Sequence, residues 1–221
     1  MKRYLPILIP IGIILALIIY FVNSGQSADL YKQLPIVGNH KLDTVSLENG
    51  AIRIDTIFHS IPDFSFTNQD GTQTTQADVE GKVYVCDYFF TTCPSICPVM
   101  SKQLDRVFDA WQDNDDVMIL SHTVDPDTDT PEQLKDYASK FDADPKRWIF
   151  LTGDKEALYT QARQGYLLDA AESFGGDEDF IHTQNFALID KHRRIRGFYD
   201  GTDEKEVNQL IKDISFLLKE Q

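Results

Sequence analysis

Two cysteines separated by three residues carry the clearest chemistry in this chain. Cys93 and Cys97 stand in the segment Thr92-Cys93-Pro94-Ser95-Ile96-Cys97-Pro98, and a proline follows each of them. Two thiols at this spacing can approach closely enough to form a disulfide or to hold one soft metal ion. The segment therefore predicts either a redox pair or a metal site.

The prolines indicate that both thiols lie at the start of a helix. Proline disfavours the α conformation in the residue before it, so neither cysteine is expected in the middle of a helix. Pro98 suits the first helical position, which places Cys97 at about the N-cap. The positive end of the helix dipole then favours the thiolate form of both cysteines. A purely structural disulfide is the alternative, but it would close a very short loop and stabilise the fold little.

The flanking patterns predict the elements that position this turn. An apolar run over residues 82–90 predicts a buried strand before it, and residues 98–111 are expected to form a helix after it. A hairpin is expected earlier, at 61–66 and 71–74, around Asn68-Gln69-Asp70-Gly71. The later elements are expected to be strands at 117–124 and 148–152, helices at 130–141 and 155–163, a hairpin at 185–190 and 195–199, and a helix at 204–218.

This order of elements predicts an α/β fold. The sequence β-α-β-α-β-β-α, with a hairpin before it, implies a mixed sheet covered by helices, and thioredoxin-like folds have this order. The redox cysteines of such folds follow the first core strand, where Cys93 and Cys97 stand here. We expect a thioredoxin-like domain over residues 56–221 with an N-terminal β-hairpin extension. Residues 23–55 are polar, lack sustained periodicity and are interpreted as a linker.

The N-terminus predicts one transmembrane helix over residues 1–22. Lys2 and Arg3 precede an uncharged run from Tyr4 to Val22, and about 20 apolar residues cross a bilayer as a helix. The positive flank stays on the cytoplasmic side, so the domain is expected on the extracytoplasmic side, where disulfides are permitted. A cleaved signal peptide is the alternative, but its apolar region is usually shorter, at about 7–15 residues.

The overall charge excludes one class of partner. The chain carries 35 acidic and 21 basic residues, for a net charge of −14. Phosphate backbones repel a protein of this charge, so we expect no nucleic acid as a partner.

The other cysteine and the histidines contain one further candidate ligand. Cys86 and His122 lie within predicted strands and are interpreted as a buried apolar residue and a hydrogen-bonded core histidine. His182 ends a long loop rich in glycine and acidic residues and comes just before the strand at 185–190. In a thioredoxin-like fold that segment lies against the cysteine turn, which makes His182 the candidate third ligand. Two thiolates and an imidazole suit Cu(I) and can hold Cu(II), whereas structural zinc usually has four protein ligands.

Three blocks of the sequence resemble the Sco/SenC family. The segment Phe89-Phe90-Thr91-Thr92-Cys93-Pro94-Ser95-Ile96-Cys97-Pro98 is similar to its signature, and Val124-Asp125-Pro126-Asp127-Thr128-Asp129-Thr130-Pro131 is similar to its second block. His182, seven residues before Ile189, matches the histidine of the family. The similar region runs from about Ser60 to Leu218.

The resemblance implies a membrane-tethered copper-binding protein with Cys93, Cys97 and His182 as ligands. Family members help to assemble the binuclear copper centre of cytochrome c oxidase by delivering copper, by reducing the cysteines of the target, or both. The implied partners are the copper-site subunit of the oxidase, together with other copper chaperones or thioredoxin-like reductants. Such a protein is a metallochaperone rather than a turnover enzyme.

One residue departs from the family pattern. Many members have an aspartate directly before the histidine, where this chain has Ile181. Asp179, Asp125 or a water molecule are the candidates to replace it. Asp125 is also a candidate to orient the imidazole of His182, because it ends a strand expected beside the cysteine strand. Capping of its own turn is the alternative role for Asp125.

Two other functions stay open at this point. A general extracytoplasmic thiol-disulfide oxidoreductase would need Cys93 and Cys97 as catalytic residues but would not need His182. A peroxide-reducing thiol enzyme on the same fold would need polar groups that position peroxide. The proline-framed pair argues more for metal binding or disulfide exchange.

Overall fold

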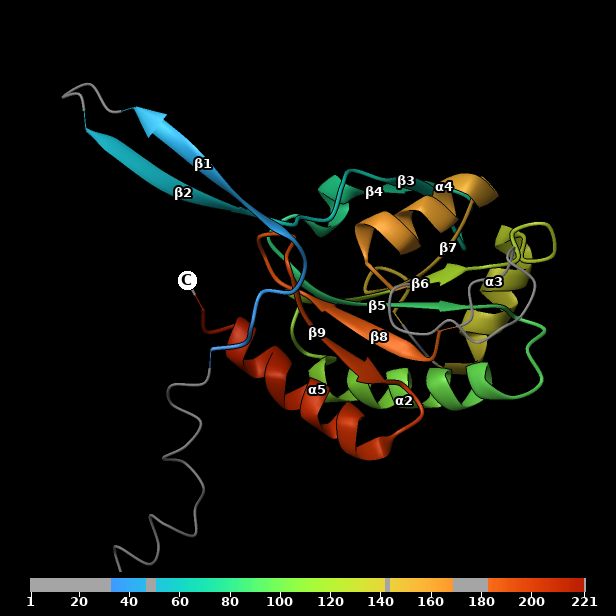
Figure 1. The fold of residues 1–221 in the computed structure, drawn as a ribbon. Coiled ribbons are helices and arrows are strands. Elements are labelled where there is room, and N and C mark those ends of the chain that lie inside the picture. The colour runs from blue at the N-terminus through green and yellow to red at the C-terminus, as the bar shows by residue number, and fades with distance from the viewer. Residues whose placement is uncertain (1–32, 47–50, 142–143, 169–182, 221) are drawn as a thin grey trace, which may run out of the picture. The chain divides into compact units, whose positions relative to one another are not determined.

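The computed structural model describes residues 33–46, 51–141, 144–168 and 183–220. Seven strands form one mixed sheet in the order β4-β3-β7-β6-β5-β8-β9 (Figure 1). The central strands β5, β6 and β7 are parallel, and the others pair antiparallel. The strands are β3 (Ser65–Asn68), β4 (Gln73–Thr75), β5 (Val83–Phe89), β6 (Val117–Thr123), β7 (Trp148–Thr152), β8 (Asn185–Ile189) and β9 (Ile195–Asp200).

Helices cover both faces of this sheet. In Figure 1, α2 and α5 lie on one face and α4 lies on the other. Every residue of β5 and β6 is buried, as expected for parallel strands covered on both sides. The predicted mixed sheet with covering helices is therefore confirmed. The helices are α2 (Ile96–Trp111), α3 (Pro131–Ala138), α4 (Lys155–Thr160) and α5 (Glu204–Leu217).

The local signals in the sequence act as expected at two of the turns. The side chain of Asn68 accepts hydrogen bonds from the N–H groups of Asp70 and Thr72, and Gly71 has φ +75°. Glycine adopts this left-handed conformation without steric cost, so the turn between β3 and β4 forms as predicted. Thr130 caps α3 by accepting a hydrogen bond from the N–H of Gln133, with proline at the first helical position.

The structure contains a further hairpin that the sequence interpretation missed. Strand β1 (His40–Ser46) pairs antiparallel with β2 (Ile52–Phe58) over seven residue pairs. The interpretation of this region as an irregular linker was wrong for these residues, and the proposed boundary at residue 56 falls inside β2. Apolar alternation is short here because the hairpin is exposed on both faces, so no core constrains its sequence.

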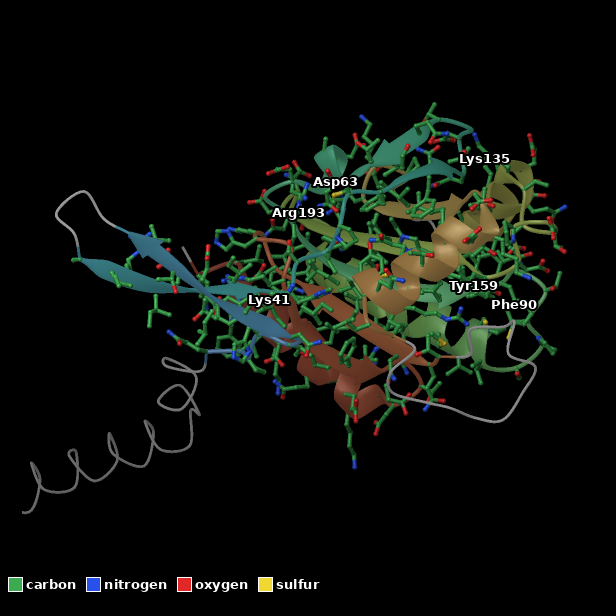
Figure 2. The ribbon with its side chains drawn as sticks, turned by 45° about the horizontal axis from the view of Figure 1, so that its top comes forward. Lys41, Asp63, Phe90, Lys135, Tyr159 and Arg193 are labelled. Carbon is green, nitrogen blue, oxygen red and sulfur yellow. The ribbon has the colours of Figure 1, made fainter. Side chains whose placement is uncertain are left out.

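The hairpin has one uncharged and one charged face. Leu42 and Ile54 point to the uncharged face and are 69% and 65% exposed. The opposite face carries Lys41, which is labelled in Figure 2. The strand register places Asp43 and Asp55 on this same face. Between the hairpin and the sheet, Val37 forms a bridge with Ile195.

The predicted membrane helix over residues 1–22 lies outside the described residues. Among the residues that are described, the structure contains no helix that is long and apolar enough to cross a membrane.

Candidate metal centre

The cysteine turn connects the end of β5 to the start of α2. Phe90, which is labelled in Figure 2, follows β5. Its carbonyl oxygen accepts a hydrogen bond of 3.2 Å from the N–H of Cys93. Cys93 and Cys97 are 9% and 3% exposed, and both contribute to the core beneath α2. All three cysteines of the chain are free thiols in this structure.

Helix α2 begins slightly earlier than the prolines suggest. Ser95 is the N-cap and Ile96 is the first helical residue, so Cys97 lies in the first turn rather than at the cap. Pro98 is then the third helical residue. Proline is tolerated there because the first four N–H groups of a helix have no partner within the helix. The helix still begins at the cysteine turn, as predicted.

The two thiols have different acidities. Burial is the largest influence on Cys93 and opposes ionisation, but hydrogen bonds outweigh it and lower the pKa of Cys93. They come from the N–H groups of Ser95, Ile96 and Cys97 and from the thiol of Cys97. The N–H of Cys97 lies 3.4 Å from the sulfur of Cys93.

Cys97 behaves in the opposite way. Burial, together with the hydrogen bond from its thiol to Cys93, raises the pKa of Cys97 to about 12. The expected shift toward the thiolate is therefore found in the pKa of Cys93, and the pKa of Cys97 shifts the opposite way. A helix N-terminus favours a thiolate, but in Cys97 desolvation by the core is the stronger effect.

Cys86 and His122 lie in the other core, on the opposite face of the sheet. The sulfur of Cys86 is 3.5 Å from Nδ1 of His122, whose ring stacks on Tyr88 at a centroid distance of 4.9 Å. Burial lowers the pKa of His122 to about 3. Both residues are fully buried, which confirms the interpretation of His122 as a hydrogen-bonded core histidine and of Cys86 as a buried core residue.

The third candidate ligand, His182, lies outside the described residues. The strand that follows it is described, and β8 pairs antiparallel with β5 through Cys86 and Ala187. The start of β8 therefore lies toward the end of β5 from which the cysteine turn leaves. Thr183, the first described residue of this segment, is buried. Ligation by His182 stays a prediction.

Asp125 lies in the turn after β6. Its carbonyl oxygen accepts hydrogen bonds from the N–H groups of Thr128 and Asp129, and its own N–H donates to the hydroxyl of Thr123. The backbone of Asp125 thus stabilises this turn, and its role beside an imidazole stays a prediction. Across the described ranges, no three His, Cys, Asp or Glu side chains gather closely enough to hold a metal ion.

Two buried carboxyl groups near the cysteine turn were missed by sequence reasoning. Asp129 accepts hydrogen bonds from Thr91 and Thr123. Asp87 alternates along β5 with Val85 and Phe89, which belong to the core beneath α2. Burial raises the pKa of Asp87 to about 7. Aspartate side chains in strands and turns usually lie in solvent, so the sequence gave no reason to expect these two to be buried. The one available indication was the position of Asp87 within the apolar run of β5.

The donor set of the turn fits a soft cation. Cys93 has a lowered pKa, and Cys97 is joined to it by hydrogen bonds from its N–H and its thiol. Thiolates are the ligands that Cu(I) and other soft ions prefer. The same pair can exchange with a disulfide, since the more acidic thiol is the nucleophile.

Comparisons with known proteins identify relatives of this chain. A family model described as SCO1/SenC matches residues 56–219. A SCO1 protein homolog from Bacillus subtilis (strain 168) is 29% identical over 161 residues, covering 72% of this chain and 83% of that protein.

Solved structures of relatives share the fold. BsSco, described as a member of the Sco family of cytochrome c oxidase assembly proteins with a disulfide switch, is 27% identical with a TM-score of 0.63, covering 74% of this chain and 95% of BsSco. ScoI of Arabidopsis thaliana with copper bound is 27% identical with a TM-score of 0.56, covering 72% of this chain and 98% of ScoI. These likenesses confirm the predicted thioredoxin-type α/β fold.

Proposed function

Because this chain belongs to the SCO1/SenC family, we propose that it binds copper and acts in the assembly of cytochrome c oxidase. The observation that carries the proposal is the pairing of Cys93 with Cys97 at the turn between β5 and α2. A copper-bound relative from Arabidopsis thaliana and an assembly-factor relative, BsSco, support it.

Copper is the cargo of this site, and three residues are proposed to hold it. Cys93 and Cys97 supply two sulfurs, and His182 supplies an imidazole nitrogen. This set suits Cu(I) and can also hold Cu(II). Cys93 is poised to bind first because its pKa is lowered, and Cys97 must lose its proton as the metal binds. Copper binding is therefore expected to release protons.

The same pair supports a second function, reduction of a disulfide in the target. The thiolate of Cys93 attacks one sulfur of the target disulfide, which forms a mixed disulfide and releases one target thiolate. Cys97 then loses its proton and attacks the sulfur of Cys93, which releases the second target thiolate. The target gains two electrons, and Cys93 and Cys97 end as a disulfide. The unequal acidity of the two thiols favours this order.

The proposed location follows from the N-terminal segment. Lys2 and Arg3 before the apolar run from Tyr4 to Val22 favour an anchor with the domain on the extracytoplasmic side. The proposed partners there are the copper-site subunit of the oxidase and a copper chaperone or thiol reductant that reloads the site.

Copper titration of the full chain with absorption spectra tests the ligand set. Samples with reduced thiols are compared for the wild type and for Cys93→Ala, Cys97→Ala and His182→Ala. We expect one copper per chain and at least a tenfold loss of affinity in each variant. His192→Ala is the matched control, because His192 is exposed in the turn between β8 and β9. Wild-type affinity in His182→Ala would contradict the three-ligand site.

A second titration separates the two functions. The wild type with its Cys93–Cys97 disulfide formed is expected to bind no copper, because no thiolate is left. If the full chain reduces a disulfide in the copper-site subunit and His182→Ala does so at an unchanged rate, thiol reduction is independent of copper. If only the copper-loaded chain restores the oxidase centre, delivery is the working function.

A further inference from the structure

A fully buried carboxylate links the cysteine turn to the loop after β6. Asp129 has no exposed surface. Its Oδ1 accepts hydrogen bonds from the N–H of Thr91 at 3.3 Å and from the hydroxyl of Thr91 at 2.5 Å. Its Oδ2 accepts from the same N–H at 3.2 Å and from the hydroxyl of Thr123 at 2.5 Å.

Among the described residues, the hydrogen-bond partners of the Asp129 carboxylate are all neutral donors. Burying a carboxylate costs several kcal/mol unless hydrogen bonds replace its hydration. Here the backbone N–H and two hydroxyl groups do so, and the hydroxyl of Thr123 in turn accepts from the N–H of Asp125. These bonds join the end of β6, the loop over 124–130 and the start of the cysteine turn.

This network acts close to the thiols. Thr91 comes two residues before Cys93, whose N–H is bonded to the carbonyl oxygen of Phe90. The N–H of Val124 donates to the carbonyl oxygen of Phe89. Hydrogen bonds therefore hold each of residues 89, 90 and 91. Those of Phe89 and Thr91 connect to the segment 123–130. The hydroxyl of Thr91 thus ties the start of the cysteine turn to a side chain 38 residues further along the chain.

We propose that Asp129 is a positioning residue that sets how readily Cys93 and Cys97 close into a disulfide or close around one ion. The inference rests on the proposed function of the two thiols. Without the bonds to Asp129, the turn samples more conformations, and the effective concentration of one sulfur at the other falls. Asp129 acts on the two sulfurs only through Thr91.

Thiol–disulfide exchange with glutathione measures this effect on the full chain. Oxidised glutathione takes two electrons and two protons from Cys93 and Cys97 and leaves as two molecules of reduced glutathione. We expect Asp129→Asn and Thr91→Val to lower the equilibrium constant for closing the disulfide about tenfold, which is about 30 mV for this two-electron couple. The double variant is expected to equal the stronger single variant, because both changes remove the same bond.

Two controls separate positioning from a general loss of structure. Thr91→Ser keeps the hydroxyl and is expected to stay within about threefold of the wild type. Asp213→Asn removes another buried carboxylate with neutral donors, Tyr199 and Gln209, in α5. It is expected to lose stability without shifting the exchange constant. If Asp129→Asn does not fold, the exchange constant of Thr91→Val still tests the proposal.

The outcomes distinguish the inference from the proposed function. A wild-type chain that neither closes the disulfide nor binds copper overturns both. The other outcome starts from a wild type that closes the disulfide or binds copper. If Asp129→Asn and Thr91→Val then have the same exchange constants and copper dissociation rates as Asp213→Asn, only the positioning role is overturned.

Discussion

The two thiols of the cysteine turn are separated by three residues yet differ in acidity and burial. Hydrogen bonds from three N–H groups and the neighbouring thiol lower the pKa of Cys93, while burial raises that of Cys97. The proposed nucleophile, Cys93, and its buried partner, Cys97, therefore lie at the start of α2. In the proposed copper binding, the same asymmetry would let Cys93 bind first, and Cys97 would lose its proton as the metal binds.

Alkylation of the reduced, copper-free chain should follow this asymmetry. At pH 7 we expect iodoacetamide to modify Cys93 at least tenfold faster than Cys97, measured by mass spectrometry of peptides. In Cys97→Ala the hydrogen bond from the thiol to Cys93 is lost, so the pKa of Cys93 rises and its reaction profile moves to higher pH. Equal rates at both cysteines would contradict the pKa order.

Two buried titratable groups in neighbouring strands should oppose each other in the pH dependence of stability. Burial lowers the pKa of His122 from 6.5 to about 3, so its contribution is present above pH 6.5 and is lost as the pH falls. Burial raises the pKa of Asp87 from 3.8 to about 7, so its contribution is present at low pH and is lost as the pH rises toward 7. Between pH 4.5 and 6.5 the two effects nearly cancel.

Single variants should expose each half of this balance. From pH 4.5 to 6.5, the unfolding free energy of His122→Phe should fall by about 2 kcal/mol relative to the wild type, and that of Asp87→Asn should rise by about 2 kcal/mol. Urea denaturation at pH 4.5, 5.5 and 6.5 measures both. Parallel pH profiles in all three proteins would show that neither group titrates as its burial indicates.

At the scale of elements, the central strands and the first hairpin differ in what holds them. Strand β5 is buried along its whole length and ends at the cysteine turn. The hairpin β1–β2 has paired backbones but exposed side chains on both faces. Stability is therefore concentrated in the sheet and in α2 and α5, which position the site, while the hairpin adds little apolar burial.

Matched substitutions in the hairpin and in α2 test this distribution. Leu42→Thr with Ile54→Thr should change the unfolding free energy by no more than about 0.5 kcal/mol, because both side chains are exposed. Leu104→Ala in α2 should cost about 2–5 kcal/mol, because it opens a cavity beneath the helix. Urea denaturation of the full chain compares them. A large loss in the hairpin variant would mean that this face is covered.

At the scale of the whole molecule, one arginine joins distant parts of the described chain. Arg196 of β9 donates to the carbonyl oxygens of Leu34 and Pro35 and to the carboxylates of Asp190 and Glu220. Its side chain is 4% exposed, so these contacts are shielded from solvent. The first described segment, the turn after β8 and the last residues thus meet at one guanidinium.

Removing this guanidinium should destabilise the whole domain. In Arg196→Met, the buried carboxylate of Asp190 loses a hydrogen-bond donor, and the carbonyl groups of Leu34 and Pro35 lose the donors that Arg196 supplied. We expect the unfolding free energy to fall by about 3 kcal/mol. Lys135→Met is the control, because its ion pair with Asp70 is exposed and should have no measurable effect (Figure 2). Thermal and urea unfolding measure both; equal stability of the two variants would contradict the role of Arg196.

Local chemistry made much of this protein predictable from its sequence. The apolar run of β5, the prolines after both cysteines, the Asp-Gly turn and the Thr-Pro start of α3 each act within a few residues, and the corresponding elements formed as expected. The site, as a pair of thiols at a strand-to-helix turn, was therefore predictable too. His182 as third ligand remains a prediction.

The sequence by itself determined the order of the elements, the type of fold and the position of the thiol pair along the chain. Only the tertiary structure decided which thiol is acidic, that Asp129 bonds to Thr91 across 38 residues, and that Cys86 meets His122 across 36. It also decided the pairing of β1 with β2. These features depend on burial and on contacts between distant segments, and neither leaves a pattern within the few residues that a local signal spans.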